Sequence, residues 1–272
     1  MPTSTRPPTA RLPSRMLPKL RRDLLTWYNA HRRDLPWRRT RDPYRIWVSE
    51  VMLQQTQVAT VIPFYHRFLQ SFPDLGALAR ADIQVVLKHW EGLGYYRRAH
   101  HLHRAARKLV DSSGGRVPDR HRAFKALPGV GDYIANAVMS IAFDQPWAVV
   151  DGNVKRVLAR LGGIGDPVNQ AAAHRVFQQT ADCLLDRRCP GTFNQALMEL
   201  GALVCTPRRP NCPECPWQAP CFARQNDATA QFPTRIRRAP VPKRAMVAGV
   251  VCHRGQVLVV QRPSEGLLAG LL

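Results

Sequence analysis

The chain has 272 residues and carries 40 Lys+Arg against 19 Asp+Glu, a formal net charge of +21 at pH 7. This length suits one or two domains with a hydrophobic core, and the charge favours a polyanionic partner, nucleic acid first. A merely soluble basic protein and a basic surface at a membrane are the alternatives. No apolar run approaches the ~20 residues of a membrane span, and the N-terminus lacks the apolar core of a secretory signal. Seven cysteines, an odd number, favour a reducing compartment and metal-bound or buried thiols.

The first predicted elements are an arm, a helix and a basic loop. Residues 1–16 mix Pro, Ser, Thr and Arg, and we expect them to form a disordered basic arm. Apolar residues at helical spacing predict a helix over residues 17–30. In the next loop Trp37 lies between Pro36 and Arg38. A lone tryptophan is usually a core residue, but in this setting stacking on a base or sugar is the better hypothesis.

A second helix is predicted to begin at Asp42, its N-cap, and to run through residue 56. Ser49 and Glu50 are the only polar residues between positions 46 and 53, which indicates a buried helix. Burial of Glu50 should raise the pKa of its carboxyl, as a general acid near neutral pH requires. A structural glutamate paired with an arginine explains the same pattern about equally well. Further helices are predicted at 58–70, 82–90 and 97–110.

The stretch around which the chain is organised runs from Leu127 to Asp151. Gly129 and Gly131, just before a helix predicted over 133–143, allow a tight turn that presents backbone N–H groups outward. A helix N-terminus behind such a turn binds an anion, here a DNA phosphate. Asp151 follows that helix, which can return its carboxylate to the same cleft. Taken singly, such residues are more often a packing turn and an ordinary N-cap.

Helices predicted at 154–161, 170–185 and 192–204 lead to Cys205, Cys212, Cys215 and Cys221. Four cysteines in Pro-rich turns indicate a metal site, and thiolates alone suit zinc or a four-iron cluster. The first gap holds Arg208 and Arg209, which would offer basic side chains to a phosphate. Residues 226–244 read as a Pro/Arg linker, and 246–253 with 256–261 predict a β-hairpin, too small for a stable sheet alone.

Together these segments resemble the MutY-type adenine DNA glycosylases of the endonuclease III superfamily, over roughly residues 20–272. The resemblance lies in the segments at 35–37 (LPW), 49–57 (SEVMLQQTQ), 92–96 (GLGYY), 150–156 (VDGNVKR) and 193–195 (FNQ), the hairpin glycines and the C-x6-C-x2-C-x5-C spacing. It implies an all-α fold with a six-helix, helix-hairpin-helix domain over 35–145 and an iron–sulfur cluster domain from 17–34 and 146–225. Residues 245–272 resemble the start of the family's Nudix-like domain, which we expect to be incomplete here.

The resemblance also implies the catalytic roles. Glu50 would protonate adenine at N7, and Asp151 would stabilise the oxocarbenium-like sugar and help water to add. Tyr133 and Asn153 would position the reacting nucleotide and Asp151. Two carboxyls in different environments divide such work in glycoside hydrolysis.

The remaining implied contacts are with DNA and a cofactor. Trp37 and Gln195 would line the adenine pocket, and Gln55 and Tyr95 would wedge into the duplex opposite the flipped base. The substrate would be double-stranded DNA with adenine opposite 8-oxoguanine or guanine, cleaved by a monofunctional base-excision repair enzyme with one [4Fe-4S] cluster on the cysteine quartet. We expect a monomer without membrane contact, in a bacterial-type cytoplasm and associated with the nucleoid.

Three other readings stay open from the sequence. A bifunctional endonuclease III-type glycosylase for oxidised pyrimidines would carry a lysine nucleophile where this chain has Tyr133. A thymine-mismatch glycosylase tolerates tyrosine there, so Glu50, Gln195 and the Nudix-like segment carry the distinction. A non-catalytic DNA-binding module with a zinc knuckle is disfavoured because Glu50 and Asp151 are both present.

Overall fold

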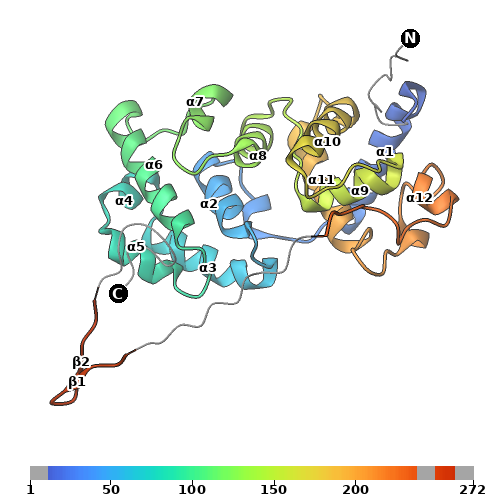
Figure 1. Cartoon of the computed structure of the whole chain (residues 1–272). Coiled ribbons are helices and arrows are strands. Elements are labelled where there is room, and N and C mark those ends of the chain that lie inside the picture. Colours follow the sequence, from blue (N-terminus) through green and yellow to red (C-terminus); the bar gives the residue numbers. More distant parts are fainter. Residues whose placement is uncertain (1–11, 238–248, 261–272) are drawn as a thin grey trace, which may run out of the picture.

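The structure is a computed structural model that describes residues 12–237 and 249–260 of the chain. It is mostly helical, which confirms the predicted all-α class, and Figure 1 shows the helices gathered into two lobes side by side. The α-helices and 3-10 helices (η) of the described residues are η1 Ser14–Met16, α1 Leu17–His31, η2 Pro36–Arg38, α2 Pro43–Leu53, α3 Val58–Ser71, α4 Leu75–Arg80, α5 Ile83–Trp90, α6 Arg97–Ser113, α7 His121–Lys125, α8 Asp132–Phe143, α9 Gly152–Gly162, α10 Ala171–Leu184, α11 Pro190–Leu203, η3 Cys212–Glu214 and α12 Phe222–Gln225.

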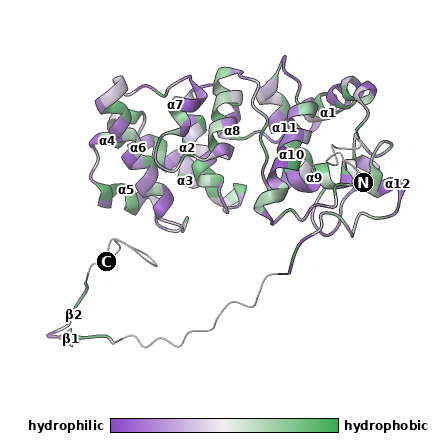
Figure 2. Cartoon of the chain, turned by 45° about the horizontal axis from the view of Figure 1, so that its top comes forward, coloured by the Kyte–Doolittle hydropathy of each residue, from purple (hydrophilic) through white to green (hydrophobic). Residues whose placement is uncertain are grey.

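Each lobe has a hydrophobic core of its own. The first lobe, α2 to α8, surrounds buried side chains between positions 35 and 149. The second lobe, α1 with α9 to α12, surrounds buried side chains from 20–28 and 148–217. Figure 2 shows helices of both lobes carrying hydrophilic and hydrophobic residues together, as expected when one helix face packs on a core. Two of the helices of the first lobe, α4 and α7, are short, with six and five residues.

Aspartate N-caps define the first residues of several helices. Aspartate side chains accept backbone N–H bonds at the first turns of α2, α4, α5 and α9; these are Asp42, Asp74, Asp82 and Asp151. The predicted start of α2 is therefore confirmed. Its end lies at Leu53, short of the predicted residue 56, because Gln55 has a left-handed φ of +58° that an α-helix cannot contain.

Helix α11 joins the two lobes. It lies so close to α8 that a Cβ on Gly191 would sit 2.4 Å from the carbonyl oxygen of Ser140, and only glycine permits this approach. Beside it the buried Asn194 side chain accepts a hydrogen bond from the Val149 N–H at 3.0 Å. The same amide donates to Ser140 Oγ at 2.9 Å and to the Trp147 carbonyl at 2.8 Å. These bonds tie the segment between α8 and α9, where the chain passes from the first lobe to the second, to α11.

Residues 226–237, the first part of the predicted linker, pack on the second lobe instead. The buried Arg160 guanidinium donates to the carbonyls of Thr229 and Phe232 at 3.1 and 3.0 Å. Asn169 Nδ2 donates to the Ile236 carbonyl at 2.8 Å. A buried guanidinium requires acceptors, and this stretch of backbone supplies them. Residues 238–244 lie outside the described residues.

At both ends of the chain, the described residues differ in part from what the sequence predicts. Residues 14–16, expected to be disordered, form a turn of 3-10 helix in front of α1, and residues 1–11 lie outside the described residues. The predicted hairpin is present as β1 Cys252–His253 and β2 Gln256–Val257, antiparallel around a two-residue turn, and lies apart from both lobes (Figure 1). Residues 245–248 and 261–272 of the Nudix-like segment lie outside the described residues. None of the described helices is long and apolar enough to cross a membrane.

Candidate active site

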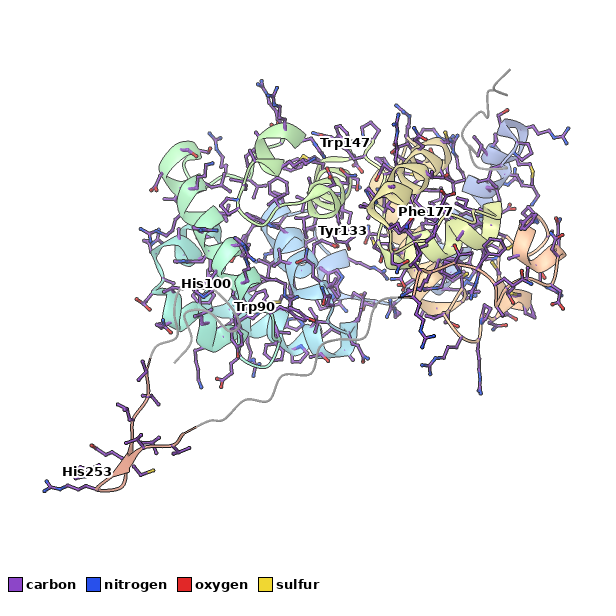
Figure 3. All side chains as sticks on the ribbon, viewed as in Figure 1. Trp90, His100, Tyr133, Trp147, Phe177 and His253 are labelled. Atoms are coloured by element: carbon purple, nitrogen blue, oxygen red, sulfur yellow. The ribbon has the colours of Figure 1, made fainter. Side chains whose placement is uncertain are left out.

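A cavity of about 180 Å³ lies between the lobes and gathers the predicted catalytic residues. Tyr133, on α8, lies on the side of the first lobe that faces the second (Figure 3). Seven polar or aromatic residues of the cavity wall concern the chemistry, namely Trp37, Glu50, Tyr133, Asp151, Asn153, Gln195 and Glu199. Six of these were predicted from sequence, and Glu199 was not.

Glu50 lies on α2 and is 4% exposed. The Tyr133 hydroxyl donates a hydrogen bond to its Oε2 at 2.6 Å. Burial raises the pKa of Glu50 to about 7, and the nearby Asp151 adds to the rise, although the Tyr133 hydrogen bond and Arg38 oppose it. Glu50 is not the arginine-paired structural glutamate of the alternative reading: its hydrogen-bond partner among the described residues is a phenol. At neutral pH this carboxyl is poised to give up a proton.

Asp151 faces the same cavity from the second lobe. It is the N-cap of α9, where Oδ1 accepts the Val154 N–H at 2.7 Å, and Oδ2 accepts Asn153 Nδ2 at 2.9 Å. Burial raises the pKa of Asp151, opposed by these hydrogen bonds and by Arg156. The carboxylate is thus both an ordinary cap and a cavity residue, and its hydrogen bonds fix its orientation.

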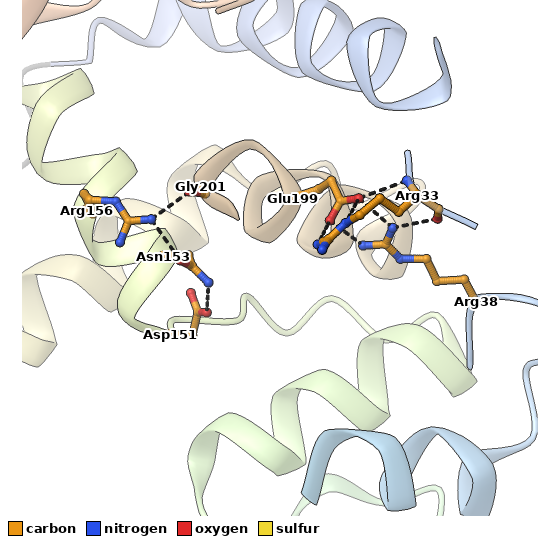
Figure 4. Close-up of polar contacts among 7 residues, drawn as sticks. All are labelled: Arg33, Arg38, Asp151, Asn153, Arg156, Glu199 and Gly201. Atoms are coloured by element: carbon orange, nitrogen blue, oxygen red, sulfur yellow. Dashed lines mark hydrogen bonds and ion pairs between the residues drawn. The ribbon is translucent and has the colours of Figure 1, made fainter. Parts of the chain in front are cut away.

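Arg156, which the sequence reading overlooked, supports this pair from behind (Figure 4). Its Nη2 donates to Asn153 Oδ1 at 2.9 Å and to the Gly201 carbonyl at 2.7 Å. Its Nε donates to the Cys205 carbonyl at 2.7 Å. A chain of hydrogen bonds therefore runs from the first cysteine of the quartet through Arg156 and Asn153 to Asp151.

Glu199 is a further charged residue of the cavity wall, and Figure 4 shows the two arginines that bind it. Arg33 donates hydrogen bonds to its carboxylate from Nε and Nη2 at 2.9 and 2.6 Å, and Arg38 donates from Nη1 and Nη2 at 2.9 and 3.0 Å. Burial alone would raise the pKa of Glu199, but these hydrogen bonds outweigh it and lower the pKa to about 2. Its sequence signal resembles that of Glu50: a lone acid between apolar neighbours on a buried helix.

The other predicted base contacts divide into two groups. Trp37 and Gln195 line the cavity, but Trp37 is 6% exposed and packs edge-on against Tyr65, so most of its ring belongs to the core. Gln55 and Tyr95 lie on exposed loops outside the cavity wall, and Tyr95 is 62% exposed. Both have left-handed φ values, +58° and +48°.

The two glycines of the hairpin between α7 and α8 differ in backbone conformation and in the space around them. Gly129 has a φ of +76°, and a Cβ there would lie 2.6 Å from the Cβ of His101 on α6. Gly131 has an ordinary φ of −89° as the N-cap of α8, and a Cβ there would meet nothing within 4 Å. The turn therefore needs glycine at Gly129, and it leaves open space at Gly131 before the helix N-terminus.

The four cysteines of the quartet are unpaired and half-buried. Three of them, Cys205, Cys215 and Cys221, pack against the second core, and Arg160 Nη1 lies 3.4 Å from Cys205 Sγ. Thiols are the donors that an iron–sulfur cluster takes, and the positive Arg160 suits its negative charge. In the described residues, however, no group of three ligands is gathered as a metal site. Arg208 and Arg209 are exposed on the loop between the first two cysteines.

Lys155 follows Asp151 closely in sequence but is turned away from the cavity. Its Nζ donates to the Val168 carbonyl at 3.2 Å and lies over the Phe177 ring. It does not contribute to the cavity wall.

Comparisons with known proteins agree with this geometry. Residues 48–179 match the family described as HhH-GPD superfamily base excision DNA repair protein. The adenine DNA glycosylase of Rattus norvegicus is 43% identical over 92% of this chain, and the chain spans 59% of that relative. The adenine DNA glycosylase of Buchnera aphidicola subsp. Baizongia pistaciae is 32% identical over 90% of the chain and 70% of the relative.

Among solved structures, a thermostable thymine-DNA glycosylase superposes with a TM-score of 0.71 at 33% identity, over 78% of this chain and 99% of that one. The matches to adenine DNA glycosylases confirm the resemblance that the sequence motifs indicate. With its helix-hairpin-helix, its two-lobed helical fold and relatives matched over most of its length, the chain belongs to the adenine DNA glycosylase family of base excision DNA repair proteins.

Proposed function

We propose that the chain is a monofunctional DNA glycosylase that removes adenine paired with 8-oxoguanine or guanine by hydrolysing the N-glycosidic bond. The observation that carries this proposal is the pair of carboxyls, Glu50 and Asp151, facing one cavity from opposite lobes. One is neutral enough to donate a proton near pH 7, and the other is held by hydrogen bonds as an acceptor. The identity to adenine DNA glycosylases supports the choice of base.

The proposed reaction begins when the adenine leaves the base stack and enters the cavity. Glu50 donates its proton to N7, so that the base departs as a neutral leaving group when the C1′–N9 bond breaks. The electron pair of that bond stays with the base, and the positive charge left on the sugar is stabilised by Asp151. Water then adds to C1′ and loses a proton to a carboxylate. Tyr133 holds Glu50 throughout and offers no amine for a covalent imine.

The cavity wall suits the base. Adenine presents an exocyclic amino donor beside a ring-nitrogen acceptor. Glu199, held ionised by Arg33 and Arg38, would accept from the amino group, and Gln195 offers both a donor and an acceptor from the same helix. Trp37 closes the cavity from the core side.

Duplex DNA would reach the cavity along the basic surface of the molecule. The open N-terminus of α8 at Gly131 suits a backbone phosphate, and Arg208 and Arg209 are exposed for another. In this proposal Gln55 and Tyr95 occupy the gap that the flipped base leaves in the stack.

The cysteine quartet would hold one [4Fe-4S] cluster. Four unpaired thiols in one loop, three of them against the second core, and Arg160 beside Cys205 support this assignment. When bound, the cluster would supply a rigid anchor for residues 205–221. No step of the base release depends on it. Iron and sulfide analysis of the purified protein, with zinc measured in parallel, tests the assignment.

A second candidate, removal of thymine from mismatches, is favoured by the structural match to a thymine-DNA glycosylase. The deciding experiment measures single-turnover base release from otherwise identical duplexes that contain A opposite 8-oxoguanine, G, C or T, and T opposite G. We expect adenine release from the first two and none from the Glu50→Gln variant, which should still bind the duplex. Release of thymine alone would overturn the proposal in favour of the second candidate. Failure of Glu50→Gln to slow release by more than tenfold, about 1.4 kcal/mol of barrier, would remove Glu50 as the acid.

A further inference from the structure

Arg98, near the start of α6, gathers carbonyl and hydroxyl groups from two separate loops. Its Nη1 donates to three carbonyls at the end of α2, those of residues 51, 52 and 54, at 2.8, 2.9 and 2.6 Å. Its Nη2 donates to Thr56 Oγ1 at 3.3 Å and to the carbonyls of Leu93 and Gly94 at 3.0 and 3.2 Å. One guanidinium therefore fastens the loop after α2 to the loop after α5.

The two loops carry residues in unusual conformations. Gln55 and Tyr95 both have positive φ, a region that residues with side chains rarely adopt, and both are exposed. Arg98 bonds the residues on either side of Gln55, namely Gln54 and Thr56, and the residue before Tyr95. The side chain of Arg98 thus bonds on both sides of one position of positive φ and directly before the other.

Arg98 makes these bonds without an acidic partner among the described residues. Its acceptors include the last carbonyls of α2, which carry the negative end of the helix dipole and would otherwise lack donors. The guanidinium carbon also lies 5.4 Å from the Trp90 ring centroid and 5.7 Å from that of Tyr95. Lysine cannot replace this arrangement, because a single ammonium has three donors radiating from one atom and no planar fork.

We propose that Arg98 is a positioning residue that locks the two loops into one rigid unit and so holds Gln55 and Tyr95 ready to enter the duplex. The inference rests on the proposed function, in which these two residues fill the gap beside the flipped adenine. Arg98 has no part in the bond cleavage itself, and its contribution is to base flipping.

The test is a double-mutant cycle on the full chain with a duplex that pairs A with 8-oxoguanine. Arg98→Lys keeps the charge and the aliphatic stem, so it is the variant of choice, with Arg98→Ala beside it. Arg107→Ala is the matched control, since this exposed arginine lies on the same helix and its side chain makes no hydrogen bond to any described residue. Flipping is followed with 2-aminopurine placed beside a 2′-fluoro-adenosine, which resists cleavage, and base release is followed in single turnover.

We expect Arg98→Lys to reduce both the flipping signal and the release rate at least tenfold in the otherwise wild-type chain. In a chain that already carries Gln55→Ala and Tyr95→Ala, the same substitution should change neither by more than twofold, because nothing is left to position. A full tenfold loss in that background, or unchanged flipping by Arg98→Lys in the wild-type background, would overturn the inference. The proposed function fails separately, if the wild-type chain releases no adenine.

Discussion

Glu50 and Glu199 are the same residue type in the same cavity, yet their environments drive them to opposite states. Glu50 is buried with a phenol as its hydrogen-bond partner, and the pKa of its carboxyl rises to about 7. Glu199 is equally buried but gripped by Arg33 and Arg38, and its pKa falls to about 2. The first can act as an acid and the second as a permanent acceptor because their partners differ.

The raised pKa of Glu50 has a consequence for stability. Below pH 4.5 the carboxyl is neutral in the folded and unfolded chain alike, and its burial brings no ionic penalty. As the pH rises from 4.5 to about 7, the unfolded chain ionises first, so stability is lost, by about 3 kcal/mol in total. Glu50→Gln removes this titration. Its free energy of unfolding relative to wild type, from urea titrations at pH 4 and pH 8, should therefore increase by a few kcal/mol. A difference that does not vary with pH would show that Glu50 ionises normally.

Tyr133 tunes the same carboxyl. Its hydrogen bond favours the ionised form of Glu50 and so lowers the pKa that burial has raised. Tyr133→Phe removes the bond, and the pKa of Glu50 should rise further. In the proposed reaction the protonated form is active, so release falls as the pH passes about 7 in wild type, and this alkaline limb should move to higher pH in Tyr133→Phe. Single-turnover rates from pH 5 to pH 9 measure the shift. Movement of the limb to lower pH would contradict this account.

At the scale of elements, the two glycines of the hairpin before α8 should differ in how much they contribute to stability. Gly129→Ala introduces a side chain at a φ of +76° and against His101, so we expect about 2–4 kcal/mol of destabilisation. At Gly131 the φ is ordinary and the space around a Cβ is open. Gly131→Ala should therefore lower the free energy of unfolding by less than about 1 kcal/mol, mainly because alanine is a weaker N-cap. Thermal and urea unfolding of the two variants provide the comparison. Equal destabilisation would mean that the shape of the turn is not set by Gly129.

Local sequence patterns were enough to predict the long helices and some of the residues of the candidate site. Periodicity placed α3, α5 and α10 to within about a turn, and a lone acid in an apolar helix pointed to Glu50. The short α4 and α7 were missed because six or five residues hold too little of a helical period. Glu199 and Arg156 were missed because their roles come from partners far along the chain, such as Arg33 and Cys205, which no local pattern connects.

At the scale of the whole molecule, the cavity depends on how the two lobes are held together. Glu50 and Tyr133 belong to the first lobe, and Asp151 and Glu199 to the second, so a small rotation would separate the two carboxyls. Two segments join the lobes, and the one between α8 and α9 passes beside α11, where Asn194 binds its backbone. Placement within a fraction of an ångström matters for catalysis.

Asn194→Ala therefore tests the connection between the lobes. The substitution leaves the buried Val149 N–H and the partly buried Trp147 carbonyl without this partner, and because an unsatisfied buried group costs about 1–3 kcal/mol, we expect a loss of about 2–3 kcal/mol. Asn226→Ala, which removes one exposed hydrogen bond within the chain's own α12 turn, should cost under about 1 kcal/mol. Base release by the folded Asn194→Ala protein should slow because the lobes shift, and its alkaline limb should move to lower pH, because Asp151 of the second lobe contributes to the raised pKa of Glu50. Wild-type release from a destabilised Asn194→Ala protein would show that other contacts between the lobes fix the alignment of the carboxyls, such as the α8 and α11 crossing at Gly191 or the bonds of Arg38 to Glu199.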